Sequence, residues 1–160
     1  AMMTAISSYV AQNYGAGKSQ RVRDGIRTCM IQSAVMTIVM SLLLYFTGIY
    51  IFRLFTSDGV VLETGVKLLH FMVPAFILYI PIEILSGSLR GVADCWIPMI
   101  ITCVGVCILR ILWVLFIAPF YAEIRWIAFC YPLTWLITSV AFVLSYSRYS
   151  VLRRPKARTN

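Results

Sequence analysis

The chain has 160 residues, of which 61% are hydrophobic and 12% are charged, and its formal net charge is +8. Typical soluble domains are about 25% charged, so this composition excludes a water-soluble globular protein. The positive charge lies between apolar runs and forms no folded basic face, which argues against a nucleic-acid partner and for attraction to anionic lipid headgroups.

Four apolar runs follow one another along the chain, each long enough to cross a ~30 Å hydrocarbon layer as a helix of about 20 residues. The predicted transmembrane helices are 29–52, 66–89, 97–121 and 126–146. Strands are excluded by the length of the runs and by their lack of alternation. A shorter apolar stretch, 1–12, is predicted to be a helix truncated by the start of the fragment. The predicted fold class is therefore an all-α integral membrane protein, with four full transmembrane helices and the end of a fifth.

Lysine and arginine residues are unevenly distributed among the segments that flank these helices. An excess of these residues is typical of the cytoplasmic side of a membrane protein. Ten lie in 13–28, directly after residue 89 and in the tail 147–160, whereas three lie in the other two connections. The ten are Lys18, Arg21, Arg23, Arg27, Arg90, Arg148, Arg153, Arg154, Lys156 and Arg158. We therefore predict a multi-pass protein of the inner (plasma) membrane, with the loop 13–28 and the C-terminal tail in the cytoplasm.

One carboxylate, Glu83, lies inside an otherwise apolar run. An acidic side chain at the centre of a membrane helix costs about 2.5–3.5 kcal/mol on insertion scales, so it indicates a functional site. At 3.6 residues per turn an aromatic and polar stripe shares its face, which predicts that this face points into the bundle. The stripe is Phe76, Tyr79, Glu83, Ser86 and Gly87. Pro74 and Pro81 permit a kink in the same helix, as at transporter binding sites and in inert membrane helices alike.

Arg110 is the basic residue deep inside a predicted span. It lies about 18 Å from the cytoplasmic end of its helix, and Glu83 about 10 Å from the end of its own, at ~1.5 Å per residue. The favoured role of Arg110 is to neutralise Glu83 or to bond backbone carbonyls. Its alternative role is to compete with a coupling ion for the carboxylate.

Two short glycine-containing motifs lie near the basic segments. Gly17, Lys18 and Ser19 end like a phosphate-binding loop, but Gln12 stands where that loop needs its first glycine and no strand precedes it, so nucleotide hydrolysis is not expected. Gly87 and Gly91 lie one helical turn apart, which predicts close backbone approach to a neighbouring helix. Arg90 could contact phosphate headgroups or pair with Asp94.

Two stretches carry a resemblance to a known family. Residues 10–18 (VAQNYGAGK), followed by Arg21, resemble the cytoplasmic signature of the multidrug and toxic compound extrusion transporters, and residues 89–94 (LRGVAD), followed by Pro98, resemble their second signature. The residues assigned to these structural motifs are Gln12, Gly15, Gly17, Gly87, Arg90, Gly91 and Asp94. Ala93 stands where the second signature usually has glycine, a small change at an expected packing position.

The resemblance implies twelve helices in two similar lobes. Because a basic tail follows the last span, it places this chain in the C-terminal lobe, with the N-terminal lobe of the same protein as its missing partner. Some branches of the family carry the cation-binding acid one turn earlier, where this chain has Tyr79, and others place it at the position of Glu83.

Together these observations predict a secondary active antiporter that exports lipophilic or cationic drugs in exchange for H⁺ or Na⁺. Glu83 is the predicted ion-coupling residue, by protonation or by binding Na⁺, and Phe76, Tyr79 and Arg110 are the candidates for the substrate cavity. Membrane lipids and a small drug-like molecule are the other expected partners, and no cofactor or catalytic residue is expected. The alternatives are a lipid-linked saccharide flippase of the same superfamily and a non-transporting helical bundle. An enzyme is disfavoured because it should cluster His, Asp or Cys at a membrane face.

Overall fold

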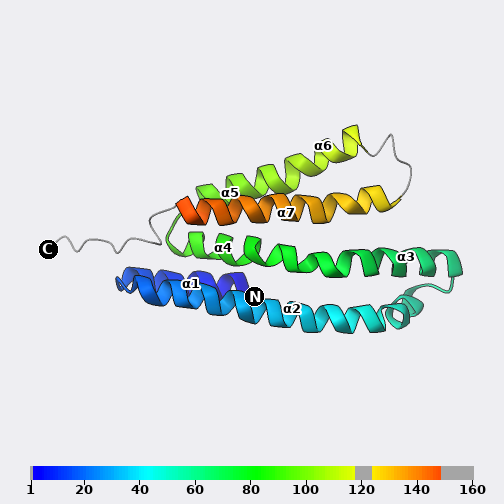
Figure 1. Cartoon of the computed structure of the whole chain (residues 1–160), viewed down its shortest axis with the longest axis horizontal. Helices are drawn as coiled ribbons and strands as arrows, with labels where there is room; N and C mark the ends of the chain where they lie inside the picture. Colours follow the sequence, from blue (N-terminus) through cyan, green and yellow to red (C-terminus); the bar gives the residue numbers. More distant parts are fainter. Residues whose placement is uncertain (1, 118–123, 149–160) are drawn as a thin grey trace.

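The computed structural model describes residues 2–117 and 124–148, which form helices joined by short turns (Figure 1). The elements are α1 (Met2–Gly15), α2 (Ser19–Phe55), α3 (Gly59–Met72), the 3₁₀-helix η1 (Val73–Tyr79), α4 (Ile80–Gly91), α5 (Trp96–Thr102), the π-helix η2 (Cys103–Ile108), α6 (Leu109–Phe116) and α7 (Ile124–Arg148). Several of these follow one another without a break, so α3, η1 and α4 form one rod and α5, η2 and α6 another.

Four long rods lie side by side along the long axis of the molecule: α2, α3–η1–α4, α5–η2–α6 and α7 (Figure 1). Within the described ranges, four helices are long and apolar enough to cross a membrane: Ser19–Phe55, Gly59–Gly91, Trp96–Phe116 and Trp126–Arg148. The predicted class of all-α membrane protein is thereby confirmed. The shorter α1 lies beside α2 and α4 at one end of the bundle.

The helix bounds differ from the predicted ones most clearly at residues 13–28. These residues were predicted to be a loop, but most of them are helical. Helix α1 continues to Gly15 and α2 already begins at Ser19, so the turn between them consists of residues 16–18. Hydropathy falls where the arginines begin, but Gln20, Arg21, Arg23 and Arg27 are good helix formers and extend α2 beyond the apolar run. The predicted ends 118–121 and 149–160 lie outside the described residues.

The region around Pro74 and Pro81 changes helix type without interrupting the rod. Pro74 stands in the first turn of η1 and Pro81 in the first turn of α4. A proline lacks the N–H that an α-helix needs, and a short 3₁₀ segment closes the chain with tighter i to i+3 bonds. Side chains three residues apart are eclipsed in a 3₁₀-helix, so Phe76 and Tyr79 in η1 stand on the same side of the rod.

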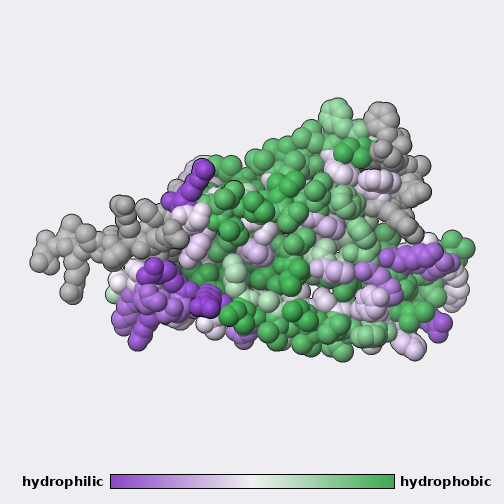
Figure 2. All heavy atoms as spheres, in the orientation of Figure 1, coloured by the Kyte–Doolittle hydropathy of each residue, from purple (hydrophilic) through white to green (hydrophobic). Residues whose placement is uncertain are grey.

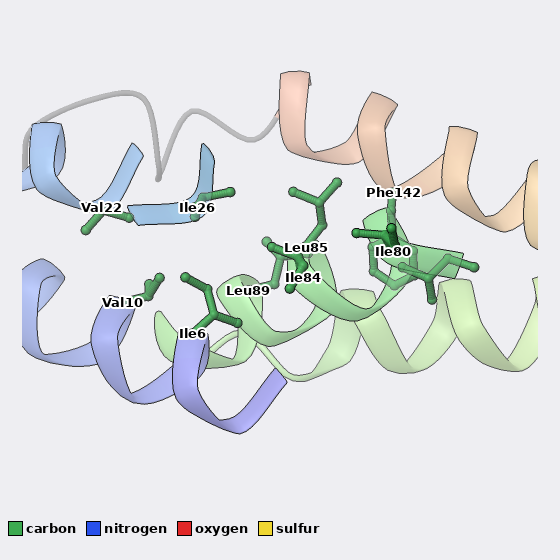
Figure 3. Close-up of a cluster of buried hydrophobic side chains, with 10 residues drawn as sticks. Ile6, Val10, Val22, Ile26, Ile80, Ile84, Leu85, Leu89 and Phe142 are labelled. Atoms are coloured by element: carbon green, nitrogen blue, oxygen red, sulfur yellow. The ribbon is translucent and has the colours of Figure 1, made fainter. Parts of the chain in front are cut away.

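A cluster of buried hydrophobic side chains lies where α1, α2, α4 and α7 meet (Figure 3). Ile6 and Val10 of α1 face Ile84 and Leu89 of α4, and Phe142 of α7 is buried on the other side of α4. The glycines of α4 make the first contact possible. A Cβ atom on Gly87 would lie 2.7 Å from the Met3 carbonyl oxygen, and one on Gly91 2.6 Å from the Ser7 carbonyl oxygen. The predicted close approach at Gly87 and Gly91 is therefore present, and α1 is the partner.

On the face that Figure 2 shows, the surface is mostly apolar between the two ends of the bundle, and the most hydrophilic side chains gather at those ends. The turn between α1 and α2, the turn between α4 and α5, and the last residue of α7, Arg148, lie at the same end (Figure 1). These segments carry the excess of lysine and arginine residues from which the cytoplasmic side was predicted. Many large side chains on α2 and α6 are exposed, as expected for helices that contact lipid or further helices.

Candidate functional site

A cavity of about 660 Å³ lies between α2, the rod η1–α4, α7 and the start of α1. This volume is within the range of small-molecule sites, which are mostly apolar with a few polar groups. Its lining has that character. The residues that line it are Met2, Ser33, Met36, Thr37, Met40, Ser41, Leu44, Phe76, Tyr79, Ile80, Glu83, Ile84 and Trp135.

Glu83 lies in the first turn of α4 and is the charged member of this lining. Its side chain is half-buried. Within the described residues the Glu83 carboxylate accepts no hydrogen bond. It also forms no ion pair among them: the salt bridge in this part of the chain joins Lys67 to Glu63, 2.6 Å apart, and both side chains are exposed on α3. An unpaired carboxylate in an apolar cavity is costly, so the site favours an occupant that supplies positive charge or a proton.

Three aromatic rings form one wall of the cavity. The Trp135 ring on α7 lies 5.9 Å from the Phe76 ring and 5.7 Å from the Tyr79 ring, centroid to centroid. Both η1 rings reach the same indole because the 3₁₀ geometry aligns them. Phe76 and Tyr79, two of the three predicted cavity residues, thus line the same cavity as Glu83. Trp135 was not among the residues predicted from the sequence, because its place depends on how α7 packs against η1.

Another part of the lining is a polar face of α2, which was also not predicted from the sequence. Ser33, Thr37 and Ser41 follow one another at intervals of four residues, with Met36 and Met40 beside them. Residues four apart share a helix face, so this row of hydroxyls within an apolar span was a signal available in the sequence.

Arg110 lies elsewhere, and the predicted neutralisation of Glu83 by Arg110 is wrong for this structure. Helix α6 packs on α7, and the Arg110 guanidinium carbon lies 4.2 Å from the centroid of the Tyr131 ring. Among the described residues Arg110 Nε is buried and has no hydrogen-bond partner. Depth along a helix does not determine direction around it, and the direction of Arg110 is toward α7. Arg110 is likewise absent from the cavity lining, for which it was a candidate.

The residues of the two motifs form turns at the same end of the bundle. Gln12 accepts a hydrogen bond from Ala16 N at 3.1 Å, and Gly17 has a φ of 71°, which reverses the chain between α1 and α2. Asp94 accepts a hydrogen bond from Ile97 N at 3.4 Å, in the first turn of α5. Gly15 is exposed and has open space around its Cα. Arg90 is exposed, and no ion pair joins it to Asp94 in the described part of the chain.

The prediction that Ala93 stands at a packing position is wrong. The position instead requires a particular backbone conformation. Its φ is 64°, in the left-handed region, and it is exposed. This conformation ends α4: Ala93 N donates to Arg90 O and Asp94 N donates to Leu89 O. Glycine reaches such a φ without steric cost, which is the physical reason for glycine at this point of the signature.

The apolar helices of this fold define a multi-pass membrane protein. A family model, MatE, matches residues 1–117, which is most of the chain. The chain belongs to the MatE family of membrane transporters, and the resemblance carried by the two motifs is confirmed. Members of this family are transporters rather than enzymes. Among curated proteins, none matches this chain.

Proposed function

We propose that the protein is a secondary active antiporter that exports lipophilic cations in exchange for H⁺ or Na⁺, with Glu83 as the coupling residue. The observation that carries the proposal is that Glu83 and the rings of Phe76, Tyr79 and Trp135 line one cavity. A lipophilic cation needs apolar contact and a counter-charge, and aromatic faces attract cations by about 0.5–2 kcal/mol each.

The coupling follows from the charge of the site. A proton or Na⁺ on Glu83 cancels the charge that would hold a cationic substrate, so the ion and the drug compete for one carboxylate. Such competition converts an ion gradient into drug export when access alternates between the two sides of the membrane. The side chain of Glu83 has no competing partner in the described residues, which leaves it available for this exchange.

The proposal assigns the chain to the C-terminal lobe of a two-lobed, twelve-helix transporter of the inner membrane, with its basic end and C-terminus in the cytoplasm. The support is the shared end of the two motif turns and Arg148, together with the excess of basic residues there (Figure 1). An N-terminal lobe would complete the cavity, which in this chain is lined by residues of α1, α2, η1, α4 and α7.

The test is efflux of a fluorescent lipophilic cation from vesicles that contain the full-length protein, under an imposed proton or sodium gradient. We expect gradient-driven efflux from the wild type and its loss in Glu83→Gln. Glu63→Gln is the matched control, because it removes the same charge from an exposed residue that lies outside the cavity. Efflux that persists in Glu83→Gln at equal protein level contradicts the role of Glu83.

Wild-type protein without efflux in either gradient contradicts the antiporter itself and favours the flippase of lipid-linked saccharides. That alternative has less support, because pyrophosphate needs cationic groups and the described lining of the cavity has no lysine or arginine. Efflux of the cation without a gradient requirement would contradict ion coupling.

A further inference from the structure

The aromatic wall of the cavity, formed by Phe76, Tyr79 and Trp135, has a further ring in contact with it on α7. The Trp135 ring lies 6.2 Å from the Tyr131 ring, centroid to centroid, with an angle of 73° between the two ring planes. Aromatic pairs prefer such an edge-to-face arrangement, so the Tyr131 ring favours one orientation of the indole. Tyr131 is not part of the cavity lining, and it therefore supports Trp135 from outside the cavity.

The backbone of α7 is weakened beside this ring pair. Pro132 follows Tyr131 inside the helix. Proline has no N–H group, so the helix lacks the hydrogen bond from residue 132 to residue 128 and bends more easily at this point. A contact from another helix therefore contributes more to the position of Tyr131 than it would in an unbroken helix.

Arg110 of α6 makes that contact. Its guanidinium carbon lies 4.2 Å from the centroid of the Tyr131 ring. Its Nε atom is buried, and within the described residues Arg110 forms no hydrogen bond or ion pair. The face of the Tyr131 ring is thus the partner that this part of the chain offers to the cation. A planar guanidinium stacks on an aromatic face, which restricts the orientation of the ring.

The π-helix η2 explains why Arg110 points toward α7. A Cβ atom on Gly105 would collide with the Thr138 side chain, so Gly105 lies on the face of its rod that packs on α7. Arg110 follows five residues later, and five residues make about 1.4 turns of an α-helix, which would turn it away from that face. The i to i+5 bonds of a π-helix bring residues five apart close to one face, and η2 makes such a bond from Leu109 N to Val104 O.

We infer that Arg110 is a positioning residue for the drug, because it holds Tyr131 against Trp135 and so keeps the aromatic wall of the cavity in its binding arrangement. This inference rests on the proposed function and adds to it a residue outside the cavity that determines drug affinity. Rings that are already held in place lose less entropy when a ligand binds. A fixed positive charge that acted only through its field would repel a cationic drug. The two roles therefore predict opposite effects on affinity when Arg110 is removed.

The experiment is equilibrium binding of a fluorescent lipophilic cation to the purified full-length protein in detergent, measured by fluorescence anisotropy beside efflux from vesicles. We expect Arg110→Met to raise the Kd about three- to fivefold, with the same rise in the KM for efflux and a kcat near the wild-type value. Arg110→Lys keeps a cation beside the ring and should restore part of the affinity. Tyr131→Leu should weaken binding as Arg110→Met does, and Tyr131→Phe should bind more tightly than Tyr131→Leu.

Two further variants test whether the effect passes through Trp135. Arg110→Met combined with Trp135→Ala should bind no more weakly than Trp135→Ala alone, because Arg110 acts through that indole. Trp113→Phe is the matched control for the packing of α6 on α7. It removes the hydrogen bond of 3.0 Å from Trp113 Nε1 to Trp126 O, outside the cavity lining, and should lower the melting temperature without changing the Kd.

The outcomes separate this inference from the function on which it rests. An unchanged or lower Kd in Arg110→Met overturns the positioning role. Equal rises of the Kd in Arg110→Met and Trp113→Phe overturn it as well, because they attribute the loss to looser packing of α6 on α7. Multiplied effects in the double variant do the same, since Arg110 then acts without Trp135. Wild-type protein that binds the cation but does not export it contradicts the antiporter alone, and the Kd values of the variants still decide the role of Arg110.

Discussion

The Arg110 guanidinium carbon lies 4.2 Å from the centroid of the Tyr131 ring, so a contact between a cation and an aromatic face joins α6 to α7. Cation–π contacts contribute about 0.5–1 kcal/mol at exposed sites and about 2 kcal/mol when desolvated. This contact explains how a basic side chain is tolerated inside an apolar helix without an acidic partner nearby.

A double-mutant cycle with Arg110→Met and Tyr131→Leu measures this contact. We expect a coupling energy of about 1 kcal/mol from the thermal unfolding of the four proteins in detergent. Tyr131→Phe keeps the aromatic face and should remain close to the wild type. Additive effects of the two substitutions would show that Arg110 is held by something other than the ring.

Ala93→Gly should stabilise the protein. A non-glycine residue in the left-handed region costs roughly 1–2 kcal/mol, and replacing it with glycine removes this cost. The greater conformational entropy of glycine in the unfolded chain offsets part of the resulting stabilisation. With a φ of 64° at Ala93, a net gain of up to about 1 kcal/mol is expected in thermal unfolding. Ala11→Gly, at an exposed position inside α1, is the opposite control and should destabilise by about 1 kcal/mol. A lower melting temperature for Ala93→Gly would contradict the conformational account.

Gly91→Ala should destabilise the contact between α1 and α4. The added Cβ would lie 2.6 Å from the Ser7 carbonyl oxygen, a backbone atom that moves only with its helix. Overpacking of this kind costs about 1–3 kcal/mol. Gly15→Ala is the control, because a Cβ there meets nothing within 4 Å, and its melting temperature should be unchanged or slightly higher. Equal stability of the two variants would mean that α1 shifts freely against α4.

Trp135→Ala should weaken drug affinity more than ion affinity. The indole contacts both η1 rings, and its loss removes one aromatic face and part of the support of the other two. We expect the KM for a lipophilic cation to rise roughly tenfold, while Na⁺ or H⁺ dependence stays near that of the wild type. Trp135→Phe preserves a ring and should show a smaller rise. An unchanged KM in Trp135→Ala would exclude this wall from substrate binding.

The sequence by itself determined the features that depend on local pattern. Apolar runs of sufficient length determined the four membrane helices, because the thickness of the bilayer sets the length of a spanning helix. Helical period placed Phe76, Tyr79 and Glu83 on a shared face, and the spacing of Gly87 and Gly91 indicated a close helix contact. Each of these depends on residues within a few turns of one another, which is the range over which sequence periodicity carries information.

Only the tertiary structure decided which helix each face meets. It turned Arg110 toward Tyr131 instead of Glu83, brought Trp135 against η1, and set the hydroxyl face of Ser33 in the same cavity as Glu83. It also showed that Ala93 serves a turn and that α2 continues through the basic segment. Rotation of one helix about its axis relative to the next depends on packing between residues far apart in the chain, such as α1 against the glycines of α4. Hydropathy and residue spacing within a single helix do not predict that rotation, because it is set by the contacts between helices.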